Sequence, residues 1–79
     1  MSEGLREVML GRMRALRVTI EALSKTADEL MRSADLLYDR PVADVLRDRA
    51  RRRRVKVLEM QGRLAALRQR YATRLRSEA

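Results

Sequence analysis

Apolar residues recur every seven positions along the first half of the chain. The repeat runs through Met9, Leu16, Leu23, Leu30 and Leu37, and the companion position is filled by Met13, Ile20, Ala27 and Ala34. Two apolar positions per heptad, sustained over four heptads, are typical of helices that pack as a coiled coil. The spacing predicts one long helix over residues 3–38, with Ser2 as its cap.

The second half of the chain carries the same pattern in reverse. Its apolar positions are Leu46, Ala50, Val57, Met60, Leu64, Leu67, Tyr71 and Leu75. When residues whose numbers sum to 80 are paired, apolar positions meet along the whole chain, as Leu16 does with Leu64. We call these paired positions the seam. Such a mirror indicates two antiparallel helices that face each other.

The point of reversal is marked by Pro41, the only proline in the chain. Proline disfavours a helical conformation at Arg40 and is itself well suited to the first turn of a new helix. We therefore predict a turn at 39–41, a second helix over 42–76, and a single all-α domain over 1–79, an antiparallel two-helix hairpin of coiled-coil type. The alternative is one long helix kinked at Pro41, and the mirror pairing argues against it.

A chain of 79 residues is close to the lower limit for a self-sufficient core. A two-helix hairpin buries one seam and leaves most of each helix in water. Small scaffolds usually need disulfides, a metal or a partner, and this chain has no Cys and no His. We expect a protein partner or a second copy to complete the hairpin as a helical bundle.

A second stripe of small and apolar residues runs along each predicted helix. We interpret it as the partner-binding surface, which comprises Val8, Gly11, Ala15, Val18 and Ala22 on the first helix and Leu58, Gly62 and Ala65 on the second. A mid-helix glycine costs about 1 kcal/mol relative to alanine, so Gly11 and Gly62 suggest close approach of another backbone. The alternative is that small residues merely populate a solvated face.

Charge is distributed unevenly between the two halves. The chain has a net charge of +8, of which residues 1–39 contribute −1 and residues 40–79 contribute +9. Residues 47–56 form a run of basic side chains, which we call the basic run. It supplies the candidate nucleic-acid contacts, which are Arg47, Arg49, Arg51, Arg52, Arg53, Arg54 and Lys56. Such a run can neutralise several phosphates with little dependence on base sequence.

Several features weaken the case for nucleic-acid binding. Four consecutive arginines point all the way round a helix, and no aromatic residue lies among them to stack on bases. Arg53 falls in the seam opposite Ala27, where its aliphatic stem can lie along apolar surface. The mirror rule places Asp28 and Glu29 beside Arg52 and Arg51, so the run can equally be a solvated face neutralised by ion pairs.

Enzymatic chemistry is not expected. Without His or Cys there is no imidazole base, no thiolate and no ordinary transition-metal site, and the three glycines form no phosphate-binding loop. The stretch beginning Arg40-Pro41-Val42 resembles the start of the second helix in all-helical chorismate mutases, which bind a dicarboxylate with Arg and Lys. That family also needs cationic residues well inside its first helix, and the counterparts here are Ser24 or Lys25 and Ala34 or Asp35. We predict no catalytic residue, cofactor, metal or small-molecule substrate.

The sequence therefore predicts a small, non-enzymatic helical interaction protein, such as an adaptor, co-chaperone or assembly subunit. It would self-associate or dock on a partner protein through its helix faces. The alternative is a basic dimer that contacts nucleic-acid phosphates through residues 47–56. No apolar run exceeds four residues and the N-terminus has no apolar leader, so we expect no membrane span and a cytoplasmic protein.

Overall fold

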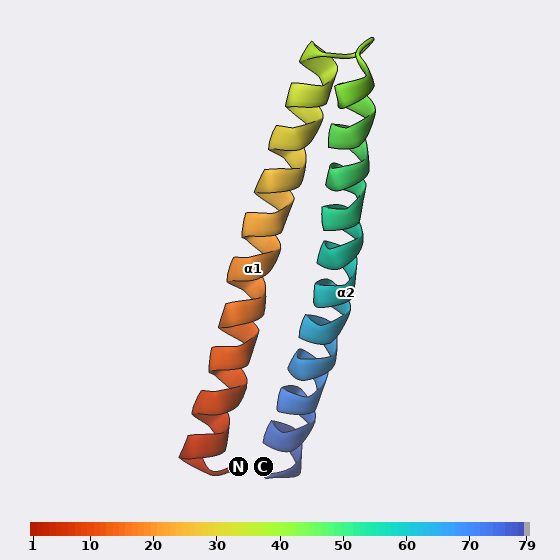
Figure 1. Cartoon of the computed structure of the whole chain (residues 1–79). Helices are drawn as coiled ribbons and strands as arrows, with labels where there is room; N and C mark the ends of the chain where they lie inside the picture. Colours follow the sequence, from red (N-terminus) through yellow and green to blue (C-terminus); the bar gives the residue numbers. More distant parts are fainter. Residues whose placement is uncertain (79) are drawn as a thin grey trace.

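The computed structural model describes residues 1–78 and consists of two long α-helices joined by a tight turn (Figure 1). Helix α1 spans Glu3–Leu36 and helix α2 spans Pro41–Ser77. The helices lie side by side and antiparallel, so both chain ends meet at one end of a body with extents of 59 × 15 × 12 Å. No strand occurs in this part of the chain. The predicted all-α antiparallel hairpin is confirmed.

Local chemistry accounts for the start of α1. The hydroxyl oxygen of Ser2 accepts a hydrogen bond of 3.1 Å from the backbone N–H of Leu5, as expected of an N-terminal cap. Glu3 places a carboxylate in the first turn, where the helix dipole favours negative charge. At the same end of the hairpin, α2 finishes with Arg74 and Arg76 in its last turn, where the dipole favours cations.

The reversal is built from three backbone hydrogen bonds. The N–H of Leu37 donates to the carbonyl oxygen of Ala34, and the N–H of Arg40 donates to the carbonyl oxygen of Leu37. The N–H of Ala43 donates to the carbonyl oxygen of Arg40, and the three distances are 2.8–3.1 Å. Arg40 is extended, with φ −95° and ψ 146°, because the following proline disfavours helical backbone there. Helix α1 therefore ends at Leu36, two residues before the predicted boundary, and α2 begins at Pro41 itself.

The core is the seam between the two helices. Its buried residues are Met9, Met13, Ala27, Ala34, Ala43, Ala50, Val57 and Leu64. Each belongs to a pair whose numbers sum to 80, and its partner is half-buried. The four alanines are 0% exposed and lie in the half of the hairpin nearest the turn, whereas the larger side chains lie nearer the termini. Covering an alanine completely requires the facing helix to come close to its Cβ, since helix separation follows the size of the contact residues.

The mirror rule holds for the seam but not for the positions beside it. Asp28 forms its ion pair with Arg54, at 3.6 Å, and not with Arg52 as the sequence suggested; Arg52 pairs with Asp48 in its own helix. Two antiparallel helices are related by a two-fold axis perpendicular to both. This axis places the residue that follows a seam position on α1 beside the residue that follows the paired seam position on α2. On one face of the hairpin, neighbouring residues of the two helices therefore have numbers that sum to 82. On the other face, where both residues precede a seam position, the numbers sum to 78.

Candidate protein-docking groove

An elongated groove runs between the helices on one face of the hairpin. We call it the basic groove; it is lined by Arg12, Ala15, Leu16, Thr19, Met60, Arg63, Ala66, Leu67 and Arg70 and has a volume of about 540 Å³. Six of these residues directly precede a seam residue in the sequence, which explains why α1 and α2 bring them to the same face. The lining spans residues 60–70 of α2, a length of roughly 15 Å at 1.5 Å per residue.

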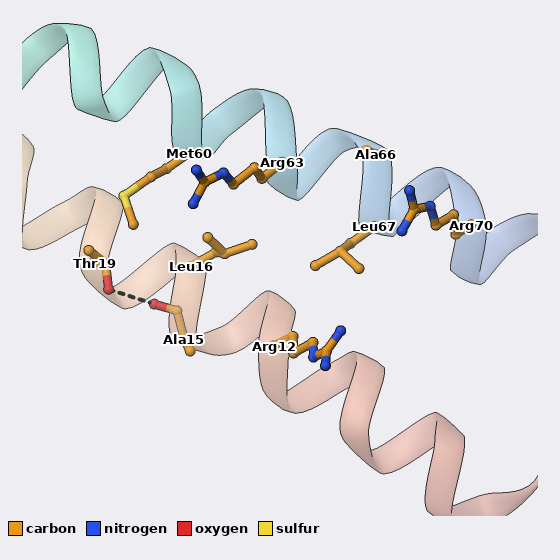
Figure 2. A pocket seen from close by; sticks show the side chains of 9 residues that line it. All are labelled: Arg12, Ala15, Leu16, Thr19, Met60, Arg63, Ala66, Leu67 and Arg70. Carbon is orange, nitrogen blue, oxygen red and sulfur yellow. Dashed lines mark hydrogen bonds between the residues drawn. The ribbon is translucent and has the colours of Figure 1, made fainter.

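The floor of the groove is apolar. Leu16 from α1 and Leu67 from α2 point toward one another between the ribbons, and Met60 extends from α2 toward Thr19 at one end of the groove (Figure 2). All three are only half-buried by the hairpin. Methionine is flexible and polarisable, so it can adapt to the shape of an incoming side chain. The floor therefore offers apolar surface that the two helices cannot cover by themselves.

The two walls of the groove differ. On α1 the wall is low, because it is formed by Ala15 and Thr19, and the Thr19 hydroxyl donates a hydrogen bond of 3.0 Å to the Ala15 carbonyl (Figure 2). On α2 the wall carries Arg63 and Arg70, and Arg12 stands across from them on α1. Within residues 1–78, no carboxylate lies within ion-pair distance of these three guanidinium groups. The rim is therefore cationic and uncompensated.

The stripe predicted to bind a partner is exposed but is not a single surface. Val8, Val18 and Leu58 are each more than half exposed, at 52%, 61% and 67%. Ala15 lines the basic groove, whereas Leu58 lines a smaller depression on the opposite face together with Ser24, Asp28, Arg54, Val57 and Gln61. The hairpin therefore brings the α1 half of the stripe and the α2 half to different faces.

The two stripe glycines are not required by the hairpin itself. A Cβ added at Gly11 or Gly62 would meet no atom within 4 Å. Packing of α1 on α2 therefore gives no reason for glycine at either position. The space outside both residues is open to another chain, as it is along the rest of the stripe.

The basic run is largely engaged in ion pairs. Its contacts are Arg47 with Asp44 at 3.2 Å, Arg52 with Asp48, Arg54 with Asp28 at 3.6 Å and Lys56 with Glu59 at 3.5 Å. Arg53 is half-buried, and its guanidinium donates to the Arg49 carbonyl at 3.5 Å, while Ala27 opposite it is fully covered. Exposed pairs of this kind contribute well under 1 kcal/mol each, so they lower the local charge without locking the side chains.

Sequence reasoning missed two features of the surface. One is the basic groove, because Arg12, Arg63 and Arg70 lie far apart in the chain and belong to no run. The other is an apolar tip beside the turn, where Leu36 is 85% and Tyr38 73% exposed, with Val42 and Val45 nearby in the chain and also exposed. The signal for the groove was present: each of the three arginines precedes a seam residue, and such positions share one face of an antiparallel hairpin.

Other kinds of site find no support in the described chain. No three acidic side chains gather there in a way that could hold a metal ion, and neither helix is long and apolar enough to cross a bilayer. All buried side-chain nitrogen and oxygen atoms of residues 1–78 have hydrogen-bond partners. Comparison with protein-family models, curated proteins and solved structures yielded no match. The groove and the charges around it are therefore the features of this structure that bear on its function.

Proposed function

We propose that this chain is a non-enzymatic helical interaction protein that completes its core by docking another protein against one face of the hairpin. The observation that carries the proposal is the basic groove, whose apolar floor of Leu16, Met60 and Leu67 stays half-open to solvent. A third helix lying between α1 and α2 would cover this floor and convert the hairpin into a bundle.

The composition of the seam supports the same proposal. Half of the eight buried residues are alanines, and no large side chain is fully buried among the described residues. Alanine contributes little apolar area, so the alanine half of the seam stabilises the hairpin less than large apolar side chains would. A partner that covers the groove would supply further buried area where the larger leucines and methionines lie.

Position-specific cross-linking in the producing cell tests the proposal. A photoreactive amino acid replaces Ala15, in the wall of the groove, and in a matched variant it replaces Arg68, which is exposed on the opposite face. We expect one dominant covalent adduct from the Ala15 position and none from Arg68. The mass of the adduct separates a second copy of this chain from a different protein. The same adducts from both positions, or none from either, would contradict docking in the groove.

A second candidate function is binding of nucleic acid through residues 47–56. It is favoured by Arg49 and Arg51, which are exposed and lack an acidic partner among residues 1–78. Phosphate contacts of this kind give an affinity that falls steeply with added salt. Titration of a labelled duplex tests this candidate: the Arg51→Glu, Arg54→Glu variant would lose binding, and the salt dependence would be steep.

A further inference from the structure

We infer that the occupant of the basic groove is an acidic amphipathic helix of a different protein, with two carboxylates seven residues apart that contact Arg63 and Arg70. The inference rests on the proposed docking function and specifies the chemistry of the partner. Three properties of the groove lead to it: its shape, the spacing of its arginines and the charge of the whole face.

The shape of the groove fits a helix. It lies between two antiparallel helices that run side by side, and it extends for roughly 15 Å, about three helical turns. The wall formed by Ala15 and Thr19 is low, so a docking backbone can approach α1 closely. Apolar residues spaced three and four apart on the incoming helix would pack on the floor of the groove, which is the usual mode of helix-in-groove recognition.

The arginines set the polar requirement. Arg63 and Arg70 are seven positions apart on α2, which corresponds to two turns and roughly 10.5 Å along the helix. A docked helix that runs along α2 would meet them with carboxylates at the same interval. Arg12 lies on the opposite wall, and it favours a further acidic residue where the docked helix passes it. Guanidinium–carboxylate pairs form strong, charge-assisted hydrogen bonds, and two carboxylates at this interval could pair with both arginines at once.

The charge of the face argues against a second copy as the occupant. Residues that directly precede a seam position include seven cations (Arg12, Arg49, Arg52, Lys56, Arg63, Arg70 and Arg74) and two carboxylates (Glu29 and Glu59). The opposite face, made of residues that directly follow a seam position, carries eight cations and four carboxylates. Summed over its whole length, either face of a second hairpin is therefore net positive, which disfavours it against the arginines of the groove. Helix α1 of a second copy does carry Glu21, Asp28 and Asp35 seven residues apart, but Asp28 is already paired with Arg54, so this row is partly neutralised.

Nucleic acid fits the groove less well than an acidic helix does. Leu16, Met60 and Leu67 would gain nothing from a phosphate backbone and would remain exposed to water. The groove also contains no aromatic side chain on which a base could stack. An occupant that combines an apolar face with flanking carboxylates satisfies both the floor and the rim.

The experiment uses the full chain and designed peptides. The probe is a labelled amphipathic helix of roughly three heptads, with leucines on one face and glutamates seven residues apart beside them; in the control peptide, glutamine replaces each glutamate. Binding is measured by fluorescence anisotropy at low and moderate salt. We expect the acidic peptide to bind at least about tenfold more tightly than the glutamine peptide, since hydrogen bonds to charged groups contribute more than neutral ones.

Matched charge-reversal variants locate the binding site. The double variant Arg63→Glu, Arg70→Glu should bind the acidic peptide at least about tenfold more weakly. A peptide with lysine in place of each glutamate should bind this double variant. Arg68→Glu with Arg76→Glu changes the net charge equally on the opposite face of α2 and should leave binding nearly unchanged. Circular dichroism confirms that both variants remain helical.

Two results of the peptide experiment would overturn the inference. Equal loss of binding in both variants would show a nonspecific charge effect, and binding of the glutamine peptide as tightly as the acidic one would remove the role of the arginines. These results differ from failure of the proposed function, which the Ala15 cross-link reports. An Ala15 adduct with a second copy of the chain, or with a protein lacking an acidic helix, would preserve docking but refute this partner. Binding of a labelled duplex, with no binding of either peptide, would instead favour nucleic acid.

Discussion

The Asp28 carboxylate on α1 lies 3.6 Å from a guanidinium nitrogen of Arg54 on α2. It is the one ion pair in residues 1–78 that joins side chains of the two helices. Asp28 directly follows Ala27 and Arg54 directly follows Arg53, and Ala27 and Arg53 are paired in the seam. The ion pair therefore shows that residues following seam positions on both helices lie on the same face of the hairpin. The same relationship places Arg12 on the same face as Arg63 and Arg70.

The Asp28–Arg54 pair should contribute little to stability. Both side chains are about half exposed, so we expect Asp28→Asn to lower the free energy of unfolding by less than about 1 kcal/mol. A double-mutant cycle with Arg54→Gln, measured by urea denaturation at low and high salt, would give the coupling energy. A coupling above about 2 kcal/mol, or one insensitive to salt, would contradict the view of a solvated pair.

Leucines of the seam should contribute far more than leucines of the tip. Leu64 is 5% exposed and Leu36 is 85% exposed. We expect Leu64→Ala to lower the free energy of unfolding by about 2–4 kcal/mol, through lost apolar burial and a residual cavity. Leu36→Ala should change it by less than about 0.5 kcal/mol. Thermal and urea unfolding followed by circular dichroism would measure both, and similar losses in the two variants would contradict the assigned seam.

The alanine end of the hairpin should not tolerate larger side chains. Ala34 is completely covered, whereas Ala65 is exposed on the outside of α2. We expect Ala34→Leu to lower the free energy of unfolding by about 1–3 kcal/mol, because the added volume forces the helices apart. Ala65→Leu adds the same atoms without this cost and serves as the control. An Ala34→Leu variant as stable as the original chain would show that the helices do not approach closely there.

The stripe glycines separate stability from association. Because an added Cβ at Gly11 or Gly62 meets nothing within 4 Å, we expect Gly11→Ala and Gly62→Ala each to raise the stability of the isolated hairpin by about 0.5–1 kcal/mol. Gly11→Leu and Gly62→Leu should leave the helices folded but abolish association if a partner backbone approaches these positions. Unchanged association in the leucine variants, measured by sedimentation, would assign the glycines to a solvated face.

Much of the fold could be derived from the order of residues alone. The heptad repeat, its reversal and the single Pro41 sufficed to predict two antiparallel helices, and the predicted seam contains every buried residue. The capping role of Ser2 could also be predicted, because it depends on nearest neighbours along the chain. These features are local, or follow from one repeated contact between two regular helices.

Only the tertiary structure decided what lies beside the seam. A helix places the residues before and after a seam position on opposite sides, and the two-fold relation of antiparallel helices determines which sides coincide. Asp28 therefore meets Arg54 rather than Arg52, the small-residue stripe divides between two faces, and Arg12 joins Arg63 and Arg70 around one groove. Apolar burial specifies the seam from the sequence, whereas the grouping of polar residues from distant positions depends on the handedness and direction of both helices.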